Sequence, residues 1–146
     1  VSFISSNPWD FSDELIDVMA RSENVDRTLH LPVQSGSDVI LKKMNRWYTR
    51  AEYLALIDRI REKIPDIVFT TDIIVGFPGE TRADFEDSID VVKRVDFRKT
   101  FIAWLSPRKK KKTAKNMVED TPIEEKQRRF HELDSVAFKG KKKSEI

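Results

Sequence analysis

Short β-prone runs alternate with helical patterns along the chain, and this alternation limits the fold more than any other feature. The runs lie at residues 1–6, 28–33, 67–75 and 99–105, and each is followed by turn residues and then by a helical pattern. Parallel strands need a crossover connection, which is usually a helix. We therefore predict an α/β fold in which about four parallel strands carry flanking helices.

Two of the runs say more about the sheet. The third run, 67–75, ends in nearly continuous apolar residues, which is typical of a parallel strand covered on both faces. The second run contains Pro32, which cannot donate a ladder hydrogen bond. We expect that second strand to be irregular or to lie at an edge.

Capping residues indicate where the helices begin, because a short polar side chain can accept a hydrogen bond from the free amides of the first turn. The predicted N-caps are Asp10, Ser37, Thr49, Thr81 and Thr121. The last helix should end near Phe138, before Gly140. Helical spacing places four apolar residues on the buried face of the first helix: Phe11, Leu15, Val18 and Met19.

Composition removes several classes of site. The chain has no cysteine, which excludes disulfides, a thiolate nucleophile, Cys-ligated zinc and a Cys-ligated iron–sulfur cluster. No apolar run approaches the roughly 20 residues that a membrane span requires. Residues 1–7 lack the pattern of a signal peptide. We expect a cytoplasmic globular protein with no membrane partner.

The basic charge is concentrated at the C-terminus. Residues 1–107 hold 14 basic and 18 acidic side chains, whereas residues 108–146 hold 13 basic and 7 acidic ones, including Lys109 to Lys112. A basic tail of this kind is either a solvated segment or a contact surface for nucleic acid. Charge alone leaves both interpretations open.

Ligands of parallel α/β sheets collect at the carboxyl ends of the strands, which nominates four loops. They are 5–7, 34–37, 76–81 and 106–108, although the same residues also suit ordinary turns and caps. Asp72 introduces an acid into an apolar strand, so it is either a site residue or one half of a strand-edge ion pair. We expect His30 and His131 to be structural, because neither has a second ligand at metal-binding spacing.

The order of the motifs adds a resemblance. The strings LHLPVQSGSD at 29–38, YTRAEY at 48–53, TDIIVGFPGET at 71–81 and SPR at 106–108 closely resemble the radical S-adenosylmethionine methylthiotransferases. HLPVQSGS and SPR are most similar to the branch that modifies tRNA. The chain departs from the family pattern at Trp47, where Gly is usual, and at Lys109 and Lys110, where Pro-Gly is usual.

The resemblance implies a partial TIM-like (β/α) barrel, of which this chain would form the third to sixth strands. Residues 1–120 would be the second part of the barrel, and residues 121–146 a helix and basic tail leading toward an RNA-binding domain. S-adenosylmethionine would lie across the strand ends. The implied polar contacts to cofactor or substrate are Ser5, Asn7, Gln34, Ser35, Asp72 and Arg108, and the implied adenine contacts are Ile74, Val75 and Gly76.

The same resemblance implies methylthiolation of the adenine C2 of isopentenylated adenosine in the tRNA anticodon loop. Its [4Fe-4S] clusters require cysteines that this chain lacks, so we expect the chain alone to bind no metal and to be inactive. A non-catalytic RNA-binding or scaffold module derived from the barrel is the alternative. Because a half-barrel leaves a sheet edge unpaired, we also expect self-association.

Overall fold

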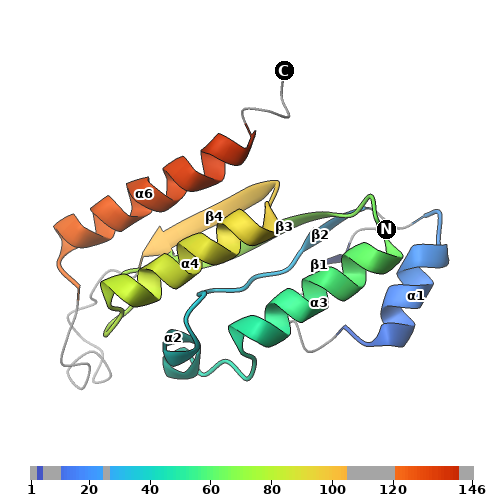
Figure 1. Cartoon of the computed structure of the whole chain (residues 1–146), viewed down its shortest axis with the longest axis horizontal. Coiled ribbons are helices and arrows are strands. Elements are labelled where there is room, and N and C mark those ends of the chain that lie inside the picture. Colours follow the sequence, from blue (N-terminus) through green and yellow to red (C-terminus); the bar gives the residue numbers. More distant parts are fainter. Residues whose placement is uncertain (1–2, 5–10, 25–26, 105–120, 142–146) are drawn as a thin grey trace.

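The computed structural model describes residues 3–4, 11–24, 27–104 and 121–141 (Figure 1). Its strands are β1 (Phe3–Ile4), β2 (Thr28–His30), β3 (Val68–Val75) and β4 (Lys99–Trp104). Its helices are α1 (Asp13–Arg21), α2 (Asp38–Lys43), α3 (Arg50–Lys63), α4 (Arg82–Val95) and α6 (Ile123–Lys141). None of the described helices is long and apolar enough to cross a membrane.

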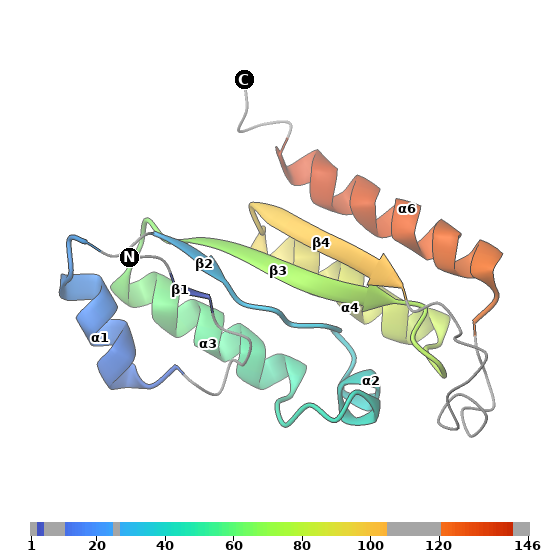
Figure 2. The same cartoon turned by 180° about the vertical axis from the view of Figure 1, so that it is seen from behind.

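The four strands form one parallel sheet in the order β1-β2-β3-β4, which confirms the predicted α/β fold class. Helices α3 and α4 lie on one face of this sheet, and α6 runs beside β4 (Figure 1). Seen from behind, the other face carries no described helix (Figure 2). We call this second surface the open face.

Burial alternates along β3, because successive side chains point to opposite faces of the sheet. Phe69, Thr71, Ile73 and Val75 are buried against the helices, while the residues between them are only half-buried. The expectation that both faces of this strand are covered is therefore wrong for the described part of the chain. Side chains alternate across a strand, so every second residue of β3 points to the open face.

The cap predictions are largely confirmed. Ser37, Thr49 and Thr81 are the N-caps of α2, α3 and α4, and the last two form capping boxes. The prediction for α1 is wrong, because Ser12 is its N-cap and accepts a 3.1 Å hydrogen bond from the Leu15 amide. Asp10 lies outside the described residues.

Helix faces and ends differ from expectation at two places. In α1 the buried residues are Ile16 and Met19, whereas Val18 is 52% exposed. Leu15 packs against the core as well, so Val18 is the one of the four predicted residues that does not face the core. Helix α6 begins at Ile123 and continues to Lys141, because a single glycine costs a helix only about 1 kcal/mol.

The continuation of β2 is irregular around Pro32, as predicted. The Leu31 amide still donates to the Thr70 carbonyl, but the next amide on that side, that of Val33, donates to a side chain, and the Asp72 carbonyl accepts one residue later, from Gln34. The Thr71 hydroxyl repairs the gap: it accepts from the Val33 amide at 2.9 Å and donates to the Leu31 carbonyl at 3.0 Å. Pairing with β3 then resumes at Gln34.

Two tyrosines of the α3 region hold the same stretch from the helix side. The Tyr53 hydroxyl donates to the Leu31 carbonyl at 2.7 Å, and the Tyr48 hydroxyl donates to the Val33 carbonyl at 2.9 Å. Burial raises the pKa of Tyr48 to about 12 and raises that of Tyr53 further. The irregular segment is thereby fixed on both sides, and it leads directly into the 34–37 loop.

Helix α6 docks on the sheet and on α4. Leu133 is fully buried in the core, and the Trp104 and Phe130 rings meet edge to face with centroids 5.2 Å apart. Arg82 of α4 forms a bidentate pair with Glu132 of α6. The division of the chain at residue 120 stays a prediction.

Candidate functional site

A polar cluster occupies the open face of the sheet. His30 of β2 lies beside Thr70 and Asp72 of β3, with His30 Nδ1 2.7 Å from Thr70 Oγ1 and His30 Nε2 3.0 Å from Asp72 Oδ2. The His30 side chain is 25% exposed and the Asp72 side chain 41% exposed. The strand register makes this contact, because His30 is paired with Thr70 and Asp72 is the next residue on the same face.

The hydrogen bonds fix how the cluster can act. An ionised carboxylate only accepts, so Nε2 of His30 donates to Asp72. In the neutral ring, Nδ1 then accepts from the Thr70 hydroxyl. This leaves Asp72 Oδ1 without a partner among the described residues, so it can accept a hydrogen bond from a ligand N–H or O–H.

Aromatic and apolar groups border this carboxylate. Phe101 of β4 is the register partner of Asp72, is 47% exposed, and meets the His30 ring edge to face at 5.9 Å. The Lys99 ammonium lies 4.9 Å from the centre of the Phe101 ring. Ile74 is on the same face, one step nearer the carboxyl end of β3. A hydrogen-bond acceptor beside an aromatic ring and an aliphatic side chain suits a planar ligand that carries N–H or O–H groups.

The 34–37 loop is built into the molecule. Gln34 has a left-handed backbone with φ of 70° and bridges to Ile73. Ser35 is fully buried, and its hydroxyl accepts from the Ser37 amide at 3.1 Å. Any Cβ added to Gly36 would collide with the backbone of α4, so only glycine permits this close approach.

Ser37 also ties that loop to the start of α4. Its hydroxyl donates to Asp84 Oδ1 at 2.7 Å. Partial burial of Asp84 works to raise the pKa of its carboxyl, but hydrogen bonds from Thr81 and Ser37 outweigh burial and hold that pKa below its usual value. The hydrogen bond between Ser37 and Asp84 therefore joins the 34–37 loop to the capping box that begins α4.

The loop after β3 is closed by a buried ion pair. Gly76, with φ of 67°, donates its amide to Glu80 Oε1 at 2.9 Å, and Arg129 of α6 binds the same oxygen at 2.9 Å. Both side chains are almost fully buried, and burial raises the pKa of Glu80 despite these hydrogen bonds. Lys126 packs against Gly76, so the loop has little room to move.

The predicted site residues fall into three groups. Gln34, Asp72 and Ile74 lie at or next to the carboxyl end of the open face, whereas Gly76, at the same strand end, is buried beneath Lys126. Ser35 and Val75 are fully buried, and the Val75 side chain belongs to the core beneath α4, which leaves its backbone for contact. Ser5, Asn7 and Arg108 lie outside the described residues.

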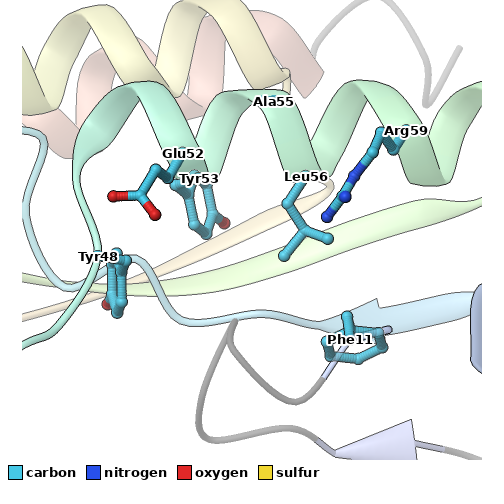
Figure 3. Close-up of a pocket in the computed structure, with 7 residues that line it drawn as sticks. All are labelled: Phe11, Tyr48, Glu52, Tyr53, Ala55, Leu56 and Arg59. Carbon is cyan, nitrogen blue, oxygen red and sulfur yellow. The ribbon is translucent and has the colours of Figure 1, made fainter. Parts of the chain in front are cut away.

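A separate cavity of about 350 Å³ lies on the helix side of the sheet (Figure 3). Its polar groups already have partners: Glu52 belongs to the capping box of α3, Arg59 pairs with Asp13, and Tyr48 and Tyr53 bind backbone carbonyls. None of the predicted site residues that the structure describes lines it. The cavity is therefore a weaker candidate site than the open face.

Sequence reasoning missed the neighbours of Asp72. His30 was expected to be structural, and neither Phe101 nor Lys99 was singled out. The available signal was positional: every second residue of adjacent parallel strands shares a face, so a histidine and an aspartate on neighbouring strands can meet. Within the described residues, no group of three or more His, Cys, Asp or Glu side chains is arranged to hold a metal ion.

Comparisons with known proteins identify the family to which the chain is similar. Residues 2–92 match the family described as the Radical SAM superfamily. Two proteins called tRNA-2-methylthio-N(6)-dimethylallyladenosine synthase are similar to the chain. The one from Thermotoga petrophila is 53% identical over 131 residues, covering 90% of this chain and 30% of its own length. The one from Fusobacterium nucleatum is 47% identical over 150 residues, covering 97% and 34%.

The match is thus extensive for this chain but partial for its relatives. A third synthase of the same name, from Caldicellulosiruptor saccharolyticus, is 51% identical over 91% of this chain and only 28% of its own length. The chain spans about a third of the length of the relatives it matches. It contains no cysteine, so this chain does not bind an iron–sulfur cluster through thiolates.

Proposed function

Because the chain belongs to the radical SAM superfamily, we propose that it forms the S-adenosylmethionine-binding wall of a tRNA methylthiotransferase barrel. The observation that carries the proposal is Asp72, which the His30 and Thr70 side chains hold on the open face with one carboxylate oxygen available. The parent reaction is the methylthiolation of adenine C2 in isopentenylated adenosine of the tRNA anticodon loop. The names of the relatives support this choice of substrate.

In this proposal the strands are the third to sixth of a (β/α) barrel, and the open face lines its interior. Asp72 accepts from an N–H or O–H of the cofactor, Ile74 and the Gly76 backbone contact the adenine, and Gln34 lies at the rim. Residues 121–141 connect the barrel toward an RNA-binding domain. S-adenosylmethionine supplies the methyl and 5′-deoxyadenosyl groups when bound.

The residues present suit S-adenosylmethionine but not the iron–sulfur cluster. The available carboxylate oxygen of Asp72, the half-buried Ile74 side chain and the exposed Phe101 ring lie together on the open face, which fits an adenosine-containing ligand. Cluster ligation requires thiolates, and the sequence supplies none. We therefore assign this chain binding and orientation of cofactor and substrate, and no step of the redox chemistry.

Equilibrium dialysis with labelled S-adenosylmethionine tests the binding role directly. Replacing Asp72 by Asn keeps the shape and removes the charge, so we expect affinity to fall about tenfold, as for loss of a hydrogen bond to a charged group. Asp66→Asn is the matched control, because Asp66 lies just before the opposite end of β3 and its side chain is 69% exposed. Equal affinity of wild type and Asp72→Asn refutes the role of Asp72.

A chimera tests the parent reaction. The matched segment of the Thermotoga petrophila synthase is replaced by this chain, and methylthiolated adenosine in tRNA is measured by mass spectrometry. We expect the chimera to form the product. The Asp72→Asn variant should form much less of it, and the Asp66→Asn variant should form as much as the unmodified chimera. A different set of results would identify an RNA-binding module instead. The chain would then bind tRNA with a steep salt dependence, would not bind S-adenosylmethionine, and would give no product in the chimera.

A further inference from the structure

Trp47 is the most exposed large hydrophobic side chain in the described part of the chain, at 78%. It belongs to the connection between α2 and α3, which lies at the end of the sheet toward which the β4 arrow points (Figures 1 and 2). This is the edge at which the 34–37 and 76–81 loops also lie. An exposed tryptophan at the edge where the ligands of parallel sheets collect can gain free energy by burying its ring against a bound partner.

The backbone around Trp47 is rigid. Helix α2 ends in a Schellman motif: Asn45 has φ of 62° and donates to the Lys42 carbonyl, and the Arg46 amide donates to the Leu41 carbonyl at 2.8 Å. On the other side, Tyr48 is buried and bonded to the backbone beside β2. Trp47 therefore projects from a fixed frame, so binding a partner costs little conformational entropy.

The start of α3 is fixed in the same way. Thr49 caps the helix in a capping box, and the Arg50 amide donates to Asp38 Oδ1 at 2.7 Å, which ties the start of α3 to the start of α2. Trp47 thus lies between the capped end of α2 and the capped start of α3, and a hydrogen bond holds these two helices together.

A cavity of about 280 Å³ lies beside the tryptophan. The residues that line it are Asp38, Lys42, Asn45, Arg46, Trp47, Tyr48 and Thr49. Lys42, Lys43 and Arg46 are exposed and form no ion pair with any described residue. The acidic member, Asp38, is already bonded to the Arg50 amide. The surroundings of Trp47 are therefore positively charged and open.

We propose that Trp47 stacks an unpaired base of single-stranded RNA beside this cavity, while Lys42 and Arg46 bind the adjoining phosphates. Exposed aromatic rings flanked by cations are the usual means of holding single-stranded nucleic acid without reading its sequence. The inference rests on the proposed function, because a tRNA loop presented to the strand ends would have nucleotides next to the modified one. It adds a second nucleotide site outside the open face.

Fluorescence anisotropy of the chain with a labelled, unstructured adenine-rich RNA oligonucleotide tests the site. Trp47→Ala should weaken binding about tenfold, as expected for one stacked base, and Trp47→Phe should weaken it no more than about threefold. Arg46→Gln should reduce the slope of log K against log salt by about 0.7, since one phosphate contact is lost. The controls are Phe138→Ala and Lys93→Gln, which remove an exposed aromatic ring and an exposed cation from other helices.

Several results would overturn the inference. These are absence of RNA binding by the wild type at low salt, equal affinity of Trp47→Ala and wild type, or an equal loss in Phe138→Ala. If Trp47→Ala instead turns a dimer into a monomer in sedimentation, the partner is a second copy and the proposal is wrong. Dialysis of Trp47→Ala with S-adenosylmethionine separates the two proposals, because cofactor binding depends on Asp72 and not on Trp47.

Discussion

Two threonines lie opposite each other on neighbouring strands, and replacing either one by valine should change the free energy of unfolding in opposite directions. Thr71 of β3 and Thr100 of β4 are register partners, and both are buried. The Thr71 hydroxyl makes two hydrogen bonds to the segment around Pro32. The Thr100 hydroxyl has no hydrogen-bond partner among the described residues. Valine has nearly the shape of threonine, so each substitution removes the hydroxyl with little change in packing volume.

The cost of Thr71→Val follows from what it leaves behind. The Leu31 carbonyl keeps the bond from Tyr53, but the Val33 amide loses its only acceptor in a buried place. An unsatisfied buried donor costs about 1–3 kcal/mol, so we expect Thr71→Val to lower the free energy of unfolding by about 2 kcal/mol. For a domain of this size the Tm should fall by roughly 4–8 °C.

Thr100→Val should be neutral or should stabilise the protein by up to about 1 kcal/mol, because a buried unpaired hydroxyl is replaced by a methyl group. Urea unfolding followed by circular dichroism measures both variants, and equal slopes against urea concentration show that the same surface unfolds. If the two variants lose the same stability, or if Thr71→Val loses less than about 0.5 kcal/mol, the repair of the Pro32 gap by Thr71 is refuted.

Two further predictions concern titrating groups. Because Asp84 has a lowered pKa in the folded state, it adds stability at pH 7 that is lost as pH falls below about 4. Asp84→Asn should therefore lower the free energy of unfolding by about 0.5 kcal/mol at pH 7 and should make that free energy depend less on pH in acid. Asp58→Asn, on the exposed face of α3, is the control and should change neither quantity. Tyr48 and Tyr53 are the only tyrosines, so tyrosinate absorbance should be absent at pH 10.5 and appear together with unfolding; normal titration in the folded protein would contradict their burial.

Local chemistry was sufficient to predict the helix starts at Ser37, Thr49 and Thr81, because an N-cap hydrogen bond joins residues only three positions apart. The same holds for β3, whose apolar and β-branched run needs no distant partner to be recognised. The contact between His30 and Asp72 joins residues 42 positions apart, and it depends on which strands pair and in which register. Periodicity within one segment contains no such information, so the cluster appears only once the sheet is assembled.

The two interpretations of Asp72 left open by the sequence are compatible in the structure. A carboxylate has two oxygens, and His30 occupies Oδ2 alone. A strand-edge partner that used both oxygens would have left a purely structural group. The bond from His30 instead fixes the rotamer of Asp72 and directs the remaining acceptor, as a supporting residue does for a binding residue. This reasoning is tested by His30→Phe, which removes that support while leaving the Asp72 side chain in place. Affinity for S-adenosylmethionine should then fall even though the contacting oxygen is intact, and an unchanged affinity would mean that Asp72 orients itself.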